Sequence, residues 1–221
     1  MKIRNLRFAI TTIIAVSISI SCQKDKSLDP NLLDGYWMSS VHLYDESIAA
    51  SVGSLYIDSI RELCTFYNIN NNFHQIMGMK FRVSGYNLVL CPGERDQQSF
   101  EILLNDNVMV LKAESGWHRQ ETHYIHVARN LVGTWNVIWE GNDGEADVTQ
   151  RFIFNADGSG KYDNSTPFSW RMGDNPNFFF PLEIDIPSVG ERKTIEIARV
   201  SLTTMKGGDE LGHNVAFVRE E

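Results

Sequence analysis

The sequence contains none of the short motifs that identify the common enzyme classes. It has no GxSxG, HExxH or GxGxxG pattern and no phosphate-binding loop. Basic residues never occur in runs longer than two, and acidic residues outnumber basic ones by 28 to 20. This charge distribution argues against a nucleic-acid partner, which selects for a basic patch or stripe. We therefore expect neither an enzyme nor a nucleic-acid-binding protein, and we expect no cofactor.

Cysteine is scarce, with three in the whole chain. Cys64 and Cys91 belong to no CxxC motif and have no neighbouring histidine, which argues against a metal site or a catalytic thiol. In an exported protein these two cysteines could form a disulfide worth roughly 3–4 kcal/mol. Two free thiols that pack as small apolar side chains are an equal alternative. The residues alone leave both alternatives open.

No apolar run reaches the roughly 20 residues that a comfortable membrane span needs, but the N-terminus carries a shorter one. Three basic residues at 2, 4 and 7 precede the uncharged stretch FAITTIIAVSISI at 8–20, a pattern typical of a secretory signal peptide. The stretch ends at Cys22 and resembles the bacterial lipobox, whose cysteine becomes the lipidated mature N-terminus. The alternative is an ordinary secretory signal that contains a cysteine.

The lipobox resemblance implies a division of the N-terminal region and an address. Residues 1–21 would be the signal peptide, Cys22 the lipid anchor and residues 22–32 a polar tether. Several acyl chains on one residue anchor a protein stably, so we expect the membrane as a partner and the outer membrane as the location. Whether the protein faces the periplasm or the exterior stays open. Without the three basic residues of the leader, 17 basic residues face 28 acidic ones, a net charge of −11.

The chain also carries an internal repeat. LDGYW at 33–37 and LVGTW at 131–135 begin alike, and their tryptophans are Trp37 and Trp135. HYIHVAR at 123–129 aligns with HNVAFVR at 213–219, which pairs Arg129 with Arg219. TFYNINNN at 65–72 aligns with RFIFNADGSG at 151–160. The repeat predicts two modules, 33–130 and 131–221.

Both modules have strand-like patterns. TWNVIWE at 134–140 alternates apolar and polar residues, and turn signals recur about every ten residues, as in all-β sandwiches or barrels. Residues 44–64 have apolar residues near helical spacing, with short strands as an equal alternative. Each module has room for about eight short strands. We predict an all-β fold of two tandem small antiparallel up-and-down barrels rather than one shared barrel.

The repeated glycine, tryptophan and arginine resemble the signature of the calycins, which include lipocalins and small bacterial lipocalin-like domains. Gly35, Trp37 and Arg129 carry the resemblance in the first module, and Gly133, Trp135 and Arg219 carry it in the second. The resemblance implies that the last strand closes each barrel beside the first, with the arginine lying across the indole. A cation over a tryptophan ring contributes about 0.5–2 kcal/mol. Glycine would let the backbone approach the ring.

Other polar and aromatic groups receive structural interpretations. His123 and His126 point to opposite faces of a strand and so do not form a metal site. ADGSG at 156–160 lacks the paired acids of a calcium loop and predicts a hairpin turn. We interpret the acidic residues at 143, 145, 147, 209 and 210 as solvated loop charges. We expect the aromatic residues at 168, 170 and 178–180 to be core rather than a ligand-binding mouth.

Two functional hypotheses follow. In the first, the protein is a lipocalin-like binding lipoprotein that holds a small apolar ligand in one barrel or in the seam between two. In the second, filled barrels present loops to an envelope protein, such as a protease or an uptake complex. A cavity above about 300 Å³ would favour the first hypothesis, and filled barrels with an exposed apolar patch would favour the second.

Overall fold

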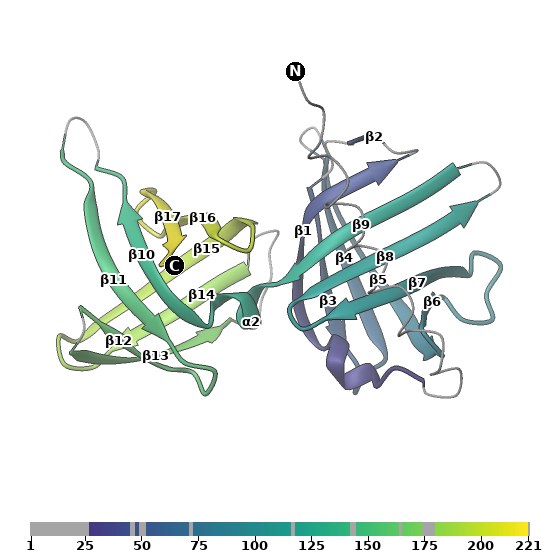
Figure 1. Cartoon of the computed structure of the whole chain (residues 1–221), viewed down its shortest axis with the longest axis horizontal. Helices are drawn as coiled ribbons and strands as arrows, with labels where there is room; N and C mark the ends of the chain where they lie inside the picture. The colour runs from purple at the N-terminus through teal and green to yellow at the C-terminus, as the bar shows by residue number, and fades with distance from the viewer. Residues whose placement is uncertain are drawn as a thin grey trace, which may run out of the picture.

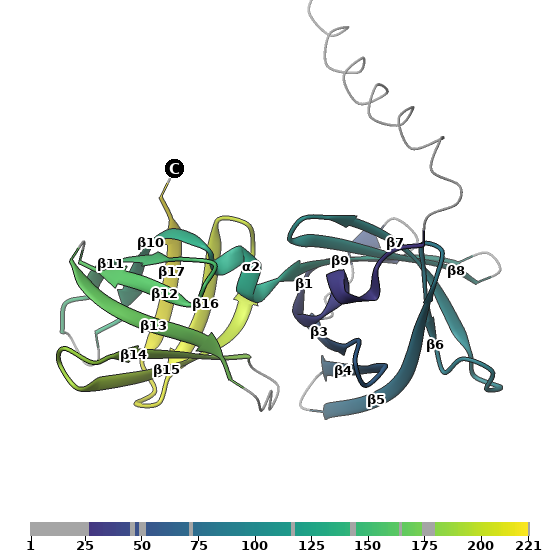
Figure 2. The ribbon, with the colours of Figure 1, turned by 90° about the horizontal axis from the view of Figure 1, so that it is seen from below.

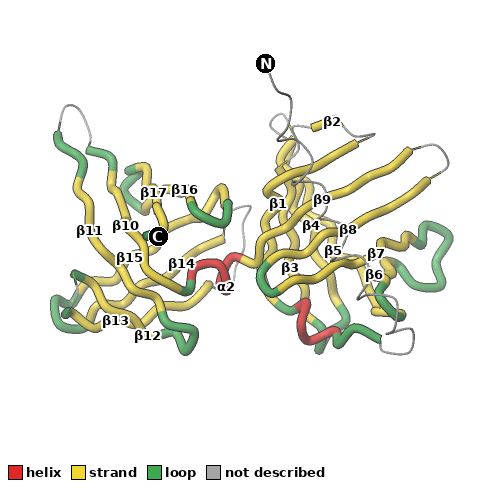
Figure 3. Tube along the Cα trace, in the orientation of Figure 1, coloured by secondary structure: helices red, strands yellow, loops and turns green. Residues whose placement is uncertain are grey.

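Two closed antiparallel β-barrels of eight strands each form the computed structural model (Figure 1). The structure describes residues 27–44, 47–48, 52–70, 73–115, 118–141, 145–163, 165–173 and 180–220. Strands account for most of this part of the chain, and the helical segments are short (Figure 3). Neither helical segment in the described ranges is long and apolar enough to cross a bilayer. The prediction of two tandem barrels is confirmed. Cys22 and the leader lie outside the described residues.

The first barrel is an up-and-down meander in which each strand pairs with the next and the last pairs with the first. Its strands are β1 (Gly35–Tyr44), β3 (Val52–Asp58), β4 (Leu63–Asn70), β5 (Phe73–Ser84), β6 (Asn87–Leu90), β7 (Gln98–Asn105), β8 (Val108–Ser115) and β9 (His118–His126). A short strand, β2 (Ser47–Ile48), pairs with the end of β1. The described part of 44–64 therefore forms strands with a turn at 59–62, where the sequence left helix and strand open.

The second barrel repeats this order without an extra strand. It consists of β10 (Gly133–Trp139), β11 (Val148–Phe154), β12 (Ser159–Tyr162), β13 (Thr166–Met172), β14 (Phe180–Ile186), β15 (Glu191–Val200), β16 (Thr204–Asp209) and β17 (Asn214–Arg219). Pairing of β10 with β17 closes the barrel, and Trp135 lies opposite Arg219 in that register. The expected alternation along β10 is confirmed, because Trp135 and Val137 are buried at every second position.

Side chains fill the interior of the second barrel. Phe152, Phe154 and Phe168 lie with their ring centroids 5.3–5.8 Å apart, and Phe180 is fully buried in the same cluster. Burial of one such side chain contributes roughly 1.5–3 kcal/mol. The expectation of a core role is confirmed for Phe168 and Phe180, and Trp170 packs against the cluster. Residues 178 and 179 lie outside the described part of the chain.

A helical turn covers one end of each barrel, which we call the closed end. The 3-10 helix η1 (Pro30–Leu33) precedes β1, and α2 (Val127–Leu131) precedes β10. Each turn ends in a leucine whose side chain is buried. The carbonyl of this leucine accepts a hydrogen bond from the indole N–H of the tryptophan on the following strand. Trp37 Nε1 donates to the Leu33 carbonyl at 2.7 Å, and Trp135 Nε1 donates to the Leu131 carbonyl at 2.6 Å. The tandem repeat therefore includes these turns as well as the strands.

Glycine follows each turn because the backbone there adopts a conformation that other residues rarely reach. Gly35 has φ 115° and Gly133 has φ 131°. A side chain would also collide with the partner strand, because a Cβ on Gly133 would lie 2.8 Å from Arg219 Nη1 and one on Gly35 would lie 2.6 Å from His126 Nε2. The chain can therefore turn from helix into strand beneath the tryptophan only with glycine at these positions.

Arg219 closes the second barrel as the sequence predicts. Its guanidinium carbon lies 4.3 Å from the centroid of the Trp135 ring. Its nitrogens donate to the carbonyls of three residues, at 2.9 Å for Leu202, at 3.1 Å for Val132 and in a further short bond to Asn130. One planar cation thus joins the last strand, the β15–β16 turn and the exit from α2.

The first barrel uses two residues for the same task, which corrects the prediction for Arg129. Arg129 lies in α2 rather than on the last strand, and His126 occupies the register position opposite Trp37. His126 Nε2 donates to the Asp34 carbonyl at 2.9 Å, and Arg129 donates to the carbonyls of Leu32 at 2.9 Å and Asp106 at 3.1 Å. The predicted contact is nevertheless present, because the Arg129 guanidinium lies over the Trp37 ring at 5.8 Å from its centroid, and only the placement of Arg129 on the last strand is wrong.

His126 is neutral at neutral pH because of these contacts. Its Nε2 donates to a carbonyl, while its Nδ1 accepts the backbone N–H of Arg129 at 3.2 Å. This pattern requires the tautomer with one proton, on Nε2. Burial, together with the positive charge of Arg129, lowers the pKa of His126 to about 4 despite the bond to Asp34. Its ring edge also faces Trp37, with 4.8 Å between the centroids.

The described residues bear on three further sequence interpretations. Cys64 and Cys91 are free; Cys64 is buried, as the alternative of two packed thiols expects, whereas Cys91 is only partly buried. Burial raises the pKa of Cys64 to about 12. The alignment of 65–72 with 151–160 is wrong by one strand, because β4 is the third large strand of its barrel and β11 is the second. The hairpin at 156–160 is confirmed: Gly158 has φ 82° and the Gly158 N–H donates to the Asn155 carbonyl.

The two barrels pack against each other through β1 (Figure 2). The Tyr36 hydroxyl donates to the Gly173 carbonyl at 2.7 Å, and its ring lies 4.8 Å from Phe180. Asn130, fully buried within α2, donates to the Ser201 carbonyl at 2.9 Å. The described outer face of β1 therefore extends the apolar cluster of the second barrel, as expected for modules with almost no linker.

The closing contact of the second barrel gives the first prediction. Trp135→Ala should lower the free energy of unfolding by about 3–5 kcal/mol because the indole is fully buried. Arg219→Ala should also destabilise the barrel, because it leaves carbonyls at the closed end without a donor. The double variant should lose about 0.5–3 kcal/mol less than the sum of the single losses, measured by urea unfolding. Additive losses would mean that the two side chains do not interact.

His126 gives a pH-dependent prediction. The unfolded chain binds a proton at this residue below about pH 6.5, whereas the folded chain resists it down to about pH 4. Stability from neutral His126 is therefore complete above pH 6.5 and declines as the pH falls toward 4, by about 3 kcal/mol in total. Urea unfolding across this window measures the decline. His126→Gln, which keeps a donor for Asp34, should flatten it, and an unchanged slope in this variant would contradict the assignment.

Candidate functional site

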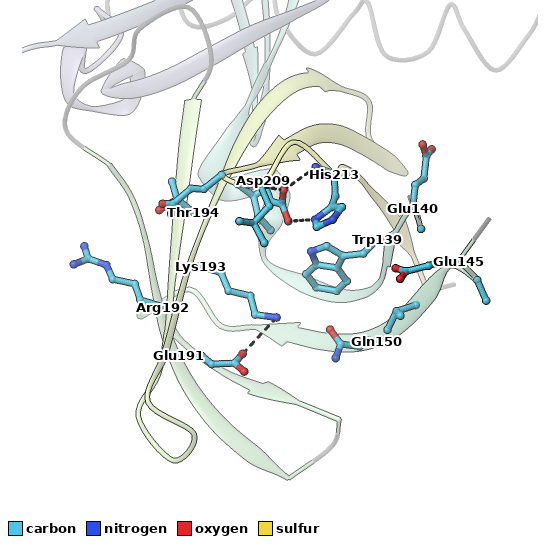
Figure 4. Close-up of a pocket in the computed structure, with 16 residues that line it drawn as sticks. Trp139, Glu140, Glu145, Gln150, Glu191, Arg192, Lys193, Thr194, Asp209 and His213 are labelled. Carbon is cyan, nitrogen blue, oxygen red and sulfur yellow. Dashed lines mark hydrogen bonds and ion pairs between the residues drawn. The ribbon is translucent and has the colours of Figure 1, made fainter. Parts of the chain in front are cut away.

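A cavity of about 590 Å³ opens at the end of the second barrel away from Trp135 (Figure 4). We call this end the mouth. The ends of β10, β11, β15, β16 and β17 and the adjacent loops form its walls. The lining residues are Trp139, Glu140, Gly141, Glu145, Ala146, Val148, Gln150, Glu191, Arg192, Lys193, Thr194, Ile195, Asp209, Glu210, Leu211 and His213.

The inward-facing side chains change from apolar to polar at the floor of the mouth. Along β15, Ile197 and Ile195 are buried in the core, and the next residue on that face is Lys193. β17 repeats the change, with buried Phe217 and Val215 followed by His213 at the strand's entrance. Successive side chains on one face of a strand are two residues apart. The barrel is therefore filled with apolar side chains at depth and lined with polar ones at its mouth.

Trp139 provides the aromatic surface of the mouth. It is the outermost inward-facing residue of β10, four residues beyond Trp135, and it packs against Phe152 with 5.8 Å between the centroids. Lys193 Nζ lies 5.0 Å from the centroid of the Trp139 ring. The same ammonium lies 3.5 Å from the Glu191 carboxylate. An ion pair thus lies over an indole face that is only partly buried.

Asp209 and His213 hold the β16–β17 turn at the rim (Figure 4). Asp209 Oδ1 accepts the backbone N–H groups of Leu211 at 3.0 Å and His213 at 2.8 Å, and Oδ2 contacts His213 Nδ1 at 2.8 Å. Desolvation raises the pKa of Asp209, but the bonds from His213 and from the backbone outweigh it and keep the pKa below its usual value. The carboxylate therefore stays ionised and fixes the ring of His213.

Gln150 and Tyr162 add hydrogen-bonding groups below the rim. Gln150 Nε2 donates to the Tyr162 hydroxyl at 2.5 Å. Burial raises the pKa of Tyr162, and nearby Asp163 and the charge of Glu191 raise it further. The hydroxyl therefore remains protonated, and its surroundings are negatively charged.

None of the repeated signature residues lies in the mouth, because all of them belong to the closed ends. His123 and His126 contact different partners: His123 bonds the Glu121 carboxylate at 2.6 Å, whereas His126 bonds the Asp34 carbonyl. The described residues contain no group of three or more side chains suited to a metal ion.

The sequence interpretation missed the residues that form the mouth. It treated the acidic residues at 145, 209 and 210 as solvated loop charges. Glu145 and Glu210 are indeed exposed and Asp209 is partly buried, but the sequence did not show that all three line one cavity. Residue 143 lies outside the described ranges. The available signal was the alternation of β15, where Lys193 continues the face of Ile195 and Ile197. In a barrel whose alternate residues face inward, a polar residue in that series marks an internal polar layer.

Comparison with known proteins gives no relative for this chain. The sequence matches no protein-family model and no curated protein at a significant level.

Asp209 gives a prediction with a matched control. Asp209→Ala should lower the free energy of unfolding by about 2 kcal/mol, because two backbone N–H groups and the His213 ring lose a charged acceptor. Glu210→Ala removes the same charge from the adjacent exposed residue and should change stability by less than about 0.5 kcal/mol. Urea unfolding of both variants measures the difference, and equal losses would show that Asp209 does not hold the turn.

Proposed function

We propose that this protein is a lipid-anchored, lipocalin-like binding lipoprotein that holds a small amphipathic ligand in the mouth of the second barrel. The observation that carries the proposal is a cavity of about 590 Å³ above a filled apolar core. Ligand sites commonly measure roughly 300–1,000 Å³ and combine apolar walls with a few polar groups. A filled core limits the depth of entry and so favours a ligand that is only partly enclosed.

The mouth offers different surfaces to the two ends of such a ligand. Val148 and Leu211 lie on either side of the opening and provide exposed apolar surface; the two residues are 54% and 80% exposed. An apolar body would cover these side chains. A polar head would lie beside the Trp139 ring, within reach of the layer formed by Gln150 and His213, whose Nε2 has no hydrogen-bond partner among the described residues. This arrangement supports an amphipathic ligand rather than the wholly apolar one expected from the sequence.

The proposed anchor and location depend on the leader sequence. The positively charged start, the apolar stretch at 8–20 and Cys22 support lipidation and attachment to the outer membrane. A tether of about ten residues would keep the barrels near the bilayer, where amphipathic molecules concentrate. The body of the protein, with its net negative charge, would be repelled by an anionic surface, which favours capture at the mouth over adsorption of the whole protein.

Mass spectrometry of the lipidated protein, purified gently from its native membrane, tests this function. We expect a small amphipathic molecule to co-purify with the natural chain and to be lost from Trp139→Ala. Trp170→Ala provides a matched control, because Trp170 packs against the same core but does not line the mouth. It should retain the ligand. Urea unfolding of both variants establishes that they fold.

Two results would contradict the proposal. A small molecule retained equally by Trp139→Ala and the natural chain would place the ligand outside the mouth. A co-purifying envelope protein with no small molecule would favour the alternative function, in which the barrels present a surface to a protein partner such as a protease or an uptake complex.

A further inference from the structure

The position of Lys193 indicates which head group the mouth binds. Its ammonium lies 5.0 Å from the Trp139 ring centroid and 3.5 Å from Glu191. An indole face attracts cations through the negative potential of its π-electrons, and a carboxylate at the edge strengthens the attraction. The side chain of Lys193 therefore shows, within the molecule, where an ammonium group fits in this cavity.

The cavity as a whole carries an excess of negative charge. Among the described residues of the lining, five are carboxylates, two are a lysine and an arginine, and His213 pairs with one of the carboxylates, Asp209. Arg192 extends away from the cavity and pairs outside it with Glu183 at 2.6 Å (Figure 4). Glu145 is directed toward Trp139 in the same view. Of the described lysine and arginine side chains of the lining, Lys193 is consequently the one that contributes its charge inside the mouth, and Glu191 already offsets that charge.

We propose that the ligand of the mouth carries a positively charged, ammonium-type head group that replaces the ammonium of Lys193 on Trp139. This inference rests on the proposed binding function and specifies the class of ligand. The apolar part of the ligand covers Val148 and Leu211, and the head lies between Trp139 and the carboxylates. Lys193 can withdraw, because its side chain is 32% exposed and its four-carbon stem is flexible.

An anionic ligand fits the same groups poorly. A carboxylate head would need Lys193 as its partner, which would break the pair with Glu191 and leave two carboxylates close together. It would also face Glu145 and Asp209 across the cavity. Like charges within one cavity repel each other, and the repulsion is strongest where the site is partly shielded from water. The two ligand classes therefore predict opposite effects for removal of the Lys193 charge.

The test uses three probes that share one phenylbutyl body and differ in the charge of the head: 4-phenylbutyl-trimethylammonium, 4-phenylbutanol and 5-phenylpentanoate. Binding is followed by NMR through the indole N–H signal of Trp139, assigned by comparison with Trp139→Phe. We expect the ammonium probe to bind the natural chain about tenfold more tightly than the alcohol, and the carboxylate probe to bind most weakly. Added salt should weaken only the ammonium probe appreciably.

Removal of the Lys193 charge distinguishes an ammonium ligand from a carboxylate ligand. Lys193→Met should tighten binding of the ammonium probe severalfold, because no lysine then competes for the indole. Lys161→Met, an exposed lysine on β12 outside the mouth, is the matched control and should change nothing. Preferential binding of the carboxylate probe, lost in Lys193→Met, would overturn the inference and leave the binding function intact. If no probe shifts the Trp139 signal, the proposed function itself fails.

Discussion

The contact between a buried tryptophan and a donor from the end of the barrel determines the rest of this structure. At the closed end of a barrel, carbonyl groups at the helical turn and the hairpin have no partner in the strand ladder. Arg219 supplies three bonds to such carbonyls while its guanidinium covers the Trp135 ring. The bonds to Val132 and Asn130 are partly buried and the bond to Leu202 is exposed. A carbonyl without a donor costs more free energy the more deeply it is buried, so the two inner bonds do most to fix where the chain enters the barrel.

The same chain satisfies this constraint in two ways. In the first barrel, His126 bonds the Asp34 carbonyl and Arg129 bonds those of Leu32 and Asp106, positions that correspond to the acceptors of Arg219 in the second barrel. The two barrels therefore share the carbonyl acceptors at the closed end. The donors differ, because one arginine serves in the second barrel and a histidine and an arginine serve in the first. In the second barrel, these contacts hold the closed end and the aromatic core fills the interior. Polar side chains can therefore line the mouth, because the barrel does not need apolar packing there.

The sequence predicted the features that depend on short, repeated patterns. The two Gly-x-Trp starts and the alternation of TWNVIWE identified two barrels, and Arg219 was correctly placed on Trp135. Features that depend on strand register were missed: a bulge between Ser39 and Val41 and the early end of β9 bring His126 opposite Trp37. The mouth was also missed. The alternation of β15 puts Lys193 on the inward face, but the pattern of one strand does not show that the polar ends of five strands meet around one cavity.

Hydrogen exchange of the backbone amides, compared between the natural chain and Arg219→Ala, shows how much of the barrel depends on this contact. We expect exchange to accelerate in α2, in the β15–β16 turn and around Trp135, whereas amides near Trp139 at the other end of β10 should keep their rates. Such local loosening is what the loss of one set of closing bonds at one end produces. Unchanged exchange at the closed end, or equal acceleration along the whole of β10, would contradict the view that this contact holds one end of the barrel and leaves the mouth independent.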